Sequence, residues 1–370
     1  MAYSVPMLLR GTPTRTIEAS PDGRTVCVLD QRLLPHRVEL LRLADLADAV
    51  WAIKDMAVRG APLIGVTAAY GLALAAAADA STEALRTAAT RLIGARPTAV
   101  NLAWAVRRAL EALLPLPPAQ RPEAAWTLAT TMADEDAAVC ESIGRQGVAL
   151  LHDLARRKPG RTLNVLTHCN AGWLATVDWG TALAPVYRAQ ADGLPVHVWV
   201  DETRPRNQGA SLTAFELAEQ GVAHTVIADN AGGHLMQHGQ VDAVIVGCDR
   251  VTAHGDVANK IGTYLKALAA HDNGVPFYVA MPTSTLDPHL TDGLAQIPIE
   301  TRDAREVTHL RGRTGDGSLV EVQLVPDGTA AANPAFDVTP ARLVTAFITE
   351  HGVVQAAAQA LGRLEQAGVR

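Results

Sequence analysis

Four polar segments after residue 160 each follow a short apolar run and carry groups that could transfer protons or hold an anion. They are residues 168–170, 201–204, 229–230 and 248–250. Within them, the thiol of Cys169 and the carboxylate of Asp249 are suited to acid–base chemistry, because both can change protonation state in a desolvated pocket. Such a pair could act on a small polar substrate.

Cys169 and Asp249 also have interpretations without a function. Cys169 is expected where a strand ends and the next helix begins, at residues 170–172, where a helix dipole lowers a thiol pKa. A free cysteine is also often only a small buried apolar side chain. Asp249 follows the apolar run 244–247, where desolvation raises a carboxyl pKa, or it caps the next helix. Cys248 is expected to point away from Asp249 into the core.

A loop after one apolar run could bind an anion. It contains Arg204, Arg206 and Gln208, and a planar guanidinium matches the oxygens of a phosphate group. The alternative for Arg204 is a salt bridge to the preceding Asp201 or Glu202.

Two further segments carry cations where helices are expected to begin. Asn259 and Lys260 precede one such helix, although a lysine on a helix is usually only solvated. Arg59 and Gly60 precede another, where Pro62 favours a helix start and glycine permits close approach of the backbone. Both arrangements could bind phosphate.

The sequence predicts neither a metal nor a nucleotide cofactor. No zinc or iron spacing joins the histidines and cysteines that were considered as ligands: His168, Cys169, His224, His234 and Cys248. The segment 167–172 lacks the glycines of a dinucleotide-binding fingerprint, and no phosphate-binding loop of the Walker type is present. We therefore expect a cofactor-independent site for a smaller ligand.

The elements that position these residues are predicted to form an α/β fold. Five β-branched runs alternate with amphipathic segments, at residues 162–167, 196–200, 224–228, 243–247 and 276–280. This repeat is typical of a Rossmann-like, doubly wound parallel sheet, whose ligands bind beyond the carboxyl ends of the strands. The polar segments lie at those ends.

The first part of the chain has a different pattern. Residues 16–39 read as a small antiparallel β-sheet, and residues 44–154 as a helical region broken at Pro97 and near residue 117. We therefore predict an N-terminal β-strand and helical domain over residues 1–155 and a C-terminal Rossmann-like catalytic domain over residues 156–370.

Composition excludes several classes of partner. The 370 residues are 48% hydrophobic and 4% aromatic, with a net charge of -6, which gives a large core but no basic or stacking surface for nucleic acid. The four cysteines form no C-x-x-C pair, which favours a reducing cytoplasm.

One apolar run raises the question of a membrane span. Residues 60–78 carry no charge, but alanine and glycine dominate them and no aromatic belt accompanies them. We therefore expect a buried helix and no membrane association.

Several segments, in order along the chain, closely resemble the methylthioribose-1-phosphate isomerase family. They are residues 54–62, 96–102, 167–172, 201–205, 208–210, 255–264, 297–300 and 333–337. The resemblance extends from about residue 20 to about residue 355. This family is similar to regulatory subunits of the exchange factor for translation initiation and to archaeal ribose-1,5-bisphosphate isomerases, so the fold alone does not define the function.

The resemblance implies a role for each matching residue. Cys169 and Asp249 fall on the family's catalytic positions. The implied substrate-binding residues are Arg59, Gly60, Ala61, Arg96, Gln208, Asn259 and Lys260. The sequence departs from the family's common residues at 177–179, at Cys248 and at His254, which bears on substrate preference.

The implied reaction converts 5-methylthioribose 1-phosphate to 5-methylthioribulose 1-phosphate in methionine salvage, by proton transfers or a hydride shift. Two alternatives remain: an isomerase of 5-deoxyribose 1-phosphate or ribose 1,5-bisphosphate, and a non-catalytic regulatory subunit. The family also implies a homodimer, and the alanine-rich helices offer apolar faces for one.

Overall fold

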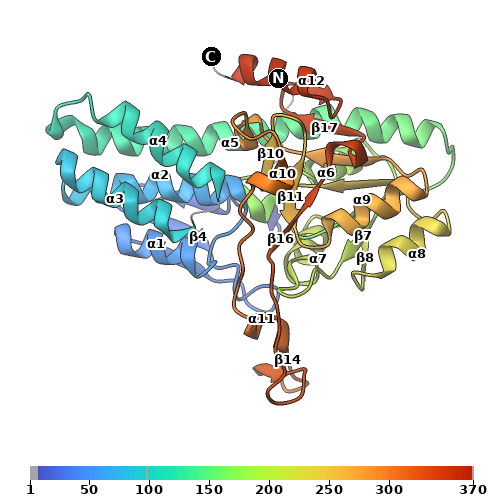
Figure 1. Cartoon of the computed structure of the whole chain (residues 1–370). Coiled ribbons are helices and arrows are strands. Elements are labelled where there is room, and N and C mark those ends of the chain that lie inside the picture. Colours follow the sequence, from blue (N-terminus) through green and yellow to red (C-terminus); the bar gives the residue numbers. More distant parts are fainter. Residues whose placement is uncertain (1–6, 97–98, 369–370) are drawn as a thin grey trace.

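The central element of the fold is a seven-stranded sheet (Figure 1). The computed structural model describes residues 7–96 and 99–368. The strand order is β18-β17-β12-β9-β6-β7-β8, and every neighbouring pair is parallel except β17 with β18. The strands are β6 (Leu163–Thr167), β7 (Val196–Asp201), β8 (Ala223–Ile227), β9 (Ala243–Val246), β12 (Phe277–Ala280), β17 (Ala346–Thr349) and β18 (Gly352–Val354). The predicted α/β class and all five predicted strands are confirmed, whereas β17 and β18 were not predicted.

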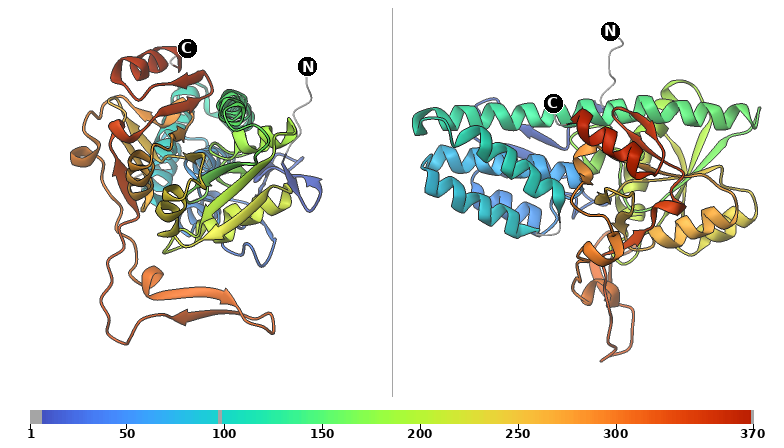
Figure 2. Two further views of the ribbon diagram at one scale, coloured as in Figure 1. Left: turned by 90° about the vertical axis from the view of Figure 1, so that its right-hand side faces the viewer. Right: turned by 45° about the horizontal axis from the view of Figure 1, so that its top comes forward.

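Helices cover both faces of this sheet (Figure 2), as expected for strands that are apolar on both sides. They are α6 (Ala184–Ala191), α7 (Ala214–Glu219), α8 (Ala231–Gln237), α9 (Thr263–Asp272) and α12 (Ala358–Gly368). Short helical turns connect them: η2 (Trp173–Ala175), η3 (Gly209–Thr213), η4 (Thr283–Thr285), η5 (Ala341–Leu343), α10 (Gly293–Gln296) and α11 (Arg305–Thr308).

The N-terminal part has the predicted small sheet followed by helices. The antiparallel sheet contains β3 (Ile17–Ala19), β4 (Val26–Leu29) and β5 (Leu40–Leu43), and a short pair β1 (Leu8–Leu9) and β2 (Thr12–Pro13) precedes it. The helices are α1 (Leu46–Lys54), α2 (Ala61–Ala78), α3 (Thr82–Ala95), α4 (Val100–Leu113), η1 (Pro118–Gln120) and α5 (Arg121–Arg156). The predicted break at Pro97 lies outside the described residues.

Two smaller sheets complete the C-terminal part. One has the order β13-β10-β11-β16 and contains β10 (Arg250–Thr252), β11 (Val257–Lys260), β13 (Leu286–Asp287) and β16 (Phe336–Thr339). The other is the hairpin of β14 (His309–Arg313) and β15 (Leu319–Gln323), which projects away from the rest of the molecule (Figures 1 and 2).

Helix α2 is the buried helix that the sequence predicts. By length and composition it could cross a membrane, but 83% of its apolar window is buried inside the protein. It begins after Gly60, whose φ of 93° lies in a region that favours glycine, and Pro62 occupies its first turn. The helix is apolar on all sides because it packs against α1, α3, α4 and α5.

Helix α5 joins two of the three hydrophobic cores. Its first half, including Ala129 and Met132, packs into the core of the N-terminal helices. Its second half, including Cys140, Ile143 and Leu151, packs into the core on one face of the main sheet. The predicted domain boundary after residue 155 falls at the end of this shared helix and remains a prediction.

Candidate active site

Cys169 follows β6 and has an unusual backbone conformation. Its φ is 66°, a left-handed value that is uncommon for residues other than glycine and often marks functional sites. Two hydroxyl groups fix this conformation: Thr203 Oγ1 accepts a hydrogen bond from the Cys169 N–H at 2.8 Å, and Thr213 Oγ1 donates one to the Cys169 carbonyl at 2.7 Å. The side chain is buried.

The prediction that a helix dipole acts on Cys169 is wrong. Only the three-residue turn η2 follows, and α6 does not begin until Ala184, because the chain first makes an irregular connection through residues 176–183. The positive charges near the thiol are instead Arg59 and Lys260. Burial lowers the pKa of both side chains, and the nearby Cys169 and Asp249 oppose this lowering.

Asp249 lies between β9 and β10, where the chain passes from the main sheet to the smaller one. Its N–H donates to the Ala258 carbonyl at 2.9 Å, and a strand follows it, so the helix-capping alternative is wrong. Burial raises the pKa of Asp249, against the opposing charges of Lys260, Arg96 and Arg59. A desolvated carboxyl group that faces three cations can hold or release a proton at this place.

A small cavity of about 30 Å³ brings together part of the predicted site. Gly60, Ala61, Arg96 and Asp249 line it. An apolar wall completes the lining and includes Ile64, Ile297, Pro298, Ile299 and Phe336. Arg96 is also 3.4 Å from the carboxylate of Glu300, so an anion that enters would compete for this guanidinium.

Gly60 allows the close packing at this cavity. A Cβ atom added there would overlap the backbone of Ala175 in η2. Both its positive φ and this contact exclude a side chain, so the start of α2 can approach the loop that follows Cys169.

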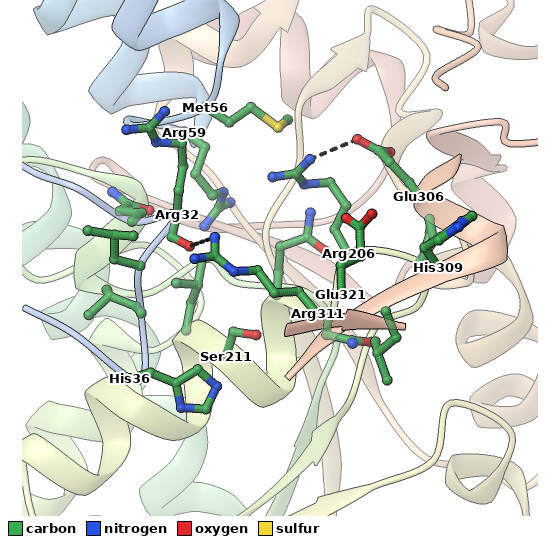
Figure 3. A pocket seen from close by; sticks show the side chains of 18 of the residues that line it. Arg32, His36, Met56, Arg59, Arg206, Ser211, Glu306, His309, Arg311 and Glu321 are labelled. Carbon is green, nitrogen blue, oxygen red and sulfur yellow. Dashed lines mark hydrogen bonds and ion pairs between the residues drawn. The ribbon is translucent and has the colours of Figure 1, made fainter. Parts of the chain in front are cut away.

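A larger cavity of about 440 Å³ has Arg59 in its lining, whereas the next residue, Gly60, lines the small one (Figure 3). Arginines from several elements line it, together with Gln208, and Arg206 forms an ion pair with Glu306 at 2.8 Å. Arg204 binds the carbonyls of Pro205 and Val307, both at 2.7 Å. Among the described residues, Arg204 forms neither of the alternative salt bridges to Asp201 and Glu202, and its role in binding an anion stays a prediction.

The two predicted amide side chains lie in different settings. Gln208 is 5% exposed, and its Oε1 has no hydrogen-bond partner among the described residues, which leaves it free to accept from a ligand. It precedes η3, a π-helical turn of the kind frequent at functional sites. Asn259 donates to Thr263 Oγ1 at 3.0 Å.

Asn259 and Lys260 end strand β11, whereas the sequence placed them at the start of a helix. Helix α9 begins three residues after Lys260, at Thr263. The Lys260 ammonium lies 4.8 Å from the centre of the Phe336 ring, on the neighbouring strand β16. The Lys260 side chain is therefore held by the smaller sheet and not by the start of a helix.

One group of possible metal ligands occurs among the described residues, and it differs from the set considered in the sequence. It comprises His168, Asp201 and Asp229. The Lys266 ammonium lies 3.1 Å from Asp201 Oδ2 and donates to the Asp229 carbonyl, so a cation already occupies this position. His168 Nδ1 is 2.9 Å from Asp201 Oδ2, which supports a structural role for this histidine.

Two polar residues behind Arg59, Asn170 and Glu216, were given no role from the sequence. Asn170 Oδ1 and the Asn170 carbonyl accept hydrogen bonds from the two terminal nitrogens of Arg59. Asn170 Nδ2 donates to Glu216, a fully buried acid in α7. The only signal in the sequence is that Glu216 stands between Phe215 and Leu217, and an acid next to apolar residues is common on half-exposed helices.

A family model and two relatives from different organisms indicate the same family for this chain. The model of the initiation factor 2 subunit family matches residues 57–356. Methylthioribose-1-phosphate isomerase from Methylobacterium nodulans is 62% identical over 358 residues, which cover 97% of this chain and 98% of the relative. The enzyme of the same name from Rhodospirillum rubrum is 60% identical, with 97% and 93% covered.

Solved structures give the same fold. The 5-methylthioribose 1-phosphate isomerase of Pyrococcus horikoshii has a TM-score of 0.82 at 39% identity, with 96% of each chain covered. A structure described as translation initiation factor eIF-2B, subunit delta, from A. fulgidus has a TM-score of 0.76 at 40% identity, with 92% of this chain and 96% of that chain covered.

Proposed function

Because this chain belongs to the methylthioribose-1-phosphate isomerases of the initiation factor 2 subunit family, we propose that it isomerises 5-methylthioribose 1-phosphate with Asp249 and Cys169 as its catalytic pair. One observation supports the assignment of the site: the buried Asp249 lies near Arg59, Arg96 and Lys260, and Arg59 and Lys260 also lie near Cys169. The site thus combines an acid, a thiol and a phosphate-binding set.

The phosphate group is held by charge in this proposal. Arg59, Arg96 and Lys260 supply three cations. Gly60 and Ala61, at the start of α2, line the small cavity, and the start of a helix favours an anion. Gln208 and Asn259 supply polar groups to the sugar. Lys260 is buried and Arg59 is half-buried, so water screens the charge of Lys260 only weakly.

The chemical difficulty lies at the anomeric carbon. Its oxygen carries phosphate, so the ring cannot open spontaneously to a free aldehyde. Asp249, whose pKa is raised by burial, gives a proton to the ring oxygen as the bond from C1 to that oxygen breaks. The hydrogen at C2 then moves to C1, and the C2 hydroxyl proton is lost as the ketone forms. Hydrogen is conserved, so no external oxidant or reductant takes part.

Two routes remain for the hydrogen at C2. Cys169 either takes part in proton transfer between C2 and C1 or stabilises an enediolate-like transition state. A hydride shift within the sugar is the other route. Isotope exchange with solvent separates them, because a proton route incorporates solvent deuterium at C1 and a hydride shift does not.

A non-catalytic regulatory subunit is the competing function. The 40% identity to the A. fulgidus structure described as an initiation-factor subunit is the observation in its favour. A regulatory subunit has no need for a buried thiol in a left-handed backbone conformation or for a desolvated acid, and both are present here.

The purified protein tests the proposal directly. We expect turnover of 5-methylthioribose 1-phosphate to the ketose, with 5-deoxyribose 1-phosphate and ribose 1,5-bisphosphate as comparison substrates. The predicted order of kcat/KM places the methylthio sugar first. If none of the three sugars is turned over, the proposal that the protein is an enzyme is contradicted. A higher kcat/KM for ribose 1,5-bisphosphate would contradict the proposed substrate.

We also propose a cytoplasmic homodimer. All four cysteines are free, which suits a reducing compartment. The edge strand β8 carries Val226 with 43% of its surface exposed, which is unusual for a buried parallel sheet and suits an interface. Sedimentation of a single 39.0 kDa species at micromolar concentration would contradict the dimer.

A further inference from the structure

Glu216 is a buried acid that the proposed chemistry does not use. Its side chain has no exposed surface, and it accepts hydrogen bonds from Asn170 Nδ2 and, at 3.3 Å, from the Leu174 N–H. A Cβ atom at Gly172 would overlap its carboxylate, so glycine at that position makes room for the acid. The fold therefore has space for this group between α7 and the loop after Cys169.

Asn170 connects this acid to Arg59. Its Nδ2 donates to Glu216 and, at 3.1 Å, to Thr213 Oγ1, while its Oδ1 accepts from Arg59. The Glu216 carboxyl group accepts hydrogen bonds from Asn170 Nδ2 and the Leu174 N–H, and a guanidinium only donates them. Glu216 and Arg59 therefore permit one orientation of the Asn170 amide, with its nitrogen towards the acid and its oxygen towards the arginine.

The bonds of Arg59 leave its charge available. Among the described residues, its hydrogen bonds go to Asn170 Oδ1 and, at 2.7 Å, to the Asn170 carbonyl, which are both neutral oxygens. An arginine bound directly to a carboxylate would have part of its charge neutralised, whereas this one keeps it for an anionic ligand. Figure 3 shows Arg59 at the wall of the larger cavity.

We propose that Glu216 is a positioning residue for substrate binding, which fixes the amide of Asn170 so that Asn170 holds the Arg59 guanidinium in place for the phosphate group. This inference rests on the proposed function, because it assigns the phosphate to Arg59. Glu216 touches neither the substrate nor the reacting atoms.

The electrostatic setting of Glu216 agrees with this role. Burial raises its pKa to about 7, and the hydrogen bonds from Asn170 and Leu174 and the charge of Arg59 oppose that rise. The other titratable group that faces it is Tyr187 of α6, whose own pKa is raised by burial and by the charge of Glu216. A neutral side chain at this position would avoid the cost of desolvating an acid. The presence of an acid therefore indicates that its oxygens are needed as hydrogen-bond acceptors.

A double-mutant cycle tests the connection. Glu216→Gln keeps the shape but can present either an oxygen or an amide nitrogen to Asn170, so we expect KM to rise about 10-fold while kcat changes by less than about 3-fold. In an Arg59→Ala background the same substitution should have no further effect on KM, because the arginine it positions is absent. Leu217→Ala is the control, since it removes buried apolar volume from the same helix; it should lower the melting temperature and leave KM unchanged.

Two outcomes would overturn the proposal. They are an unchanged KM in the Glu216→Gln variant and a KM effect of equal size with and without Arg59. Should this variant not accumulate as folded protein, Asn170→Ala enters the same cycle with the same expectations. Calorimetry of inorganic phosphate binding to each variant distinguishes the positioning role of Glu216 from the proposed isomerase activity. Weaker phosphate binding by the Glu216→Gln variant supports the positioning role even if no sugar is turned over.

Discussion

The two residues of the proposed catalytic pair, Asp249 and Cys169, are positioned by different parts of the structure. Asp249 is placed by the passage from β9 to β10, and burial raises the pKa of its carboxyl group. Cys169 is held in a left-handed conformation by the hydroxyl groups of Thr203 and Thr213. Such a conformation costs free energy, of order 1–3 kcal/mol, and persists only where the surroundings enforce it.

If both residues act on one transition state, their effects on turnover should not add. We expect Asp249→Asn and Cys169→Ser each to lower kcat by about 10² or more, and the double mutant to be little worse than the poorer single mutant. Steady-state kinetics and melting temperatures of the four proteins make the comparison. Turnover close to that of the unmodified protein in either single mutant would remove that residue from the catalytic pair.

The positions of Cys169 and Asp249 at the ends of strands could be predicted from the sequence, but the structural reasons for them could not. Cys169 and Asp249 follow predicted strands, so their location at the sheet edge could be predicted. The dipole argument for Cys169 failed because the segment after it is irregular, and no local pattern predicts that a helix begins 15 residues later, at Ala184. Glu216 was missed because burial of an acid depends on Gly172 and Asn170, which are distant in sequence.

At the scale of elements, the approach of α2 to η2 depends on one glycine. Gly60 combines a φ of 93° with no room for a side chain, because the backbone of Ala175 lies against it. The beginning of α2 and the loop after Cys169 are therefore held at a fixed separation, and the small cavity lies at the beginning of that helix.

Replacing Gly60 by alanine should damage both folding and activity. The backbone conformation costs about 1 kcal/mol for alanine, and the overlap with Ala175 should bring the loss of unfolding free energy to roughly 3 kcal/mol or more. Gly160→Ala is a matched control, since its φ is 77° but no atom lies within 4 Å of the added carbon. Chemical denaturation measures both, and equal losses in the two variants would show that the contact contributes nothing.

The elements themselves were predictable where their pattern is local. The five core strands are continuous apolar runs between turn signals, and each was found within about one residue at either end. The sheet of β10, β11, β13 and β16 was not predicted, because its pairings join distant segments such as Lys260 with Phe336. Its strands are short, and their pairing depends on the tertiary structure.

At the scale of the whole molecule, two carboxyl groups, those of Asp136 and Glu216, are buried and form no ion pair with another described residue. Burial raises the pKa of both Asp136, in α5, and Glu216 to about 7. Between the unfolded pKa near 4 and the folded pKa near 7, the folded protein holds protons that the unfolded chain has released. These groups therefore make stability fall as the pH rises through this window.

Asp136→Asn should remove part of that dependence. Asparagine can still accept the hydrogen bond that the Val177 N–H donates to Asp136 at 2.7 Å, but it carries no charge to desolvate. We expect the variant to gain on the order of 2 kcal/mol at pH 8 and almost nothing at pH 4.5. Asp134→Asn, at a 60% exposed side chain on the same helix, is the control. A gain of the same size at both pH values would contradict the assignment.

The continuous helix α5 also has a mechanical consequence. Its 36 residues extend for about 54 Å at 1.5 Å per residue, and its two halves are embedded in different cores. A rotation of the N-terminal helices away from the main sheet would have to bend or break this rod. The two cores that α5 joins should therefore move together as one body. Any adjustment to a ligand would have to come from shorter elements such as the hairpin β14–β15, which contacts the N-terminal part where Arg311 donates to the Arg32 carbonyl at 3.4 Å.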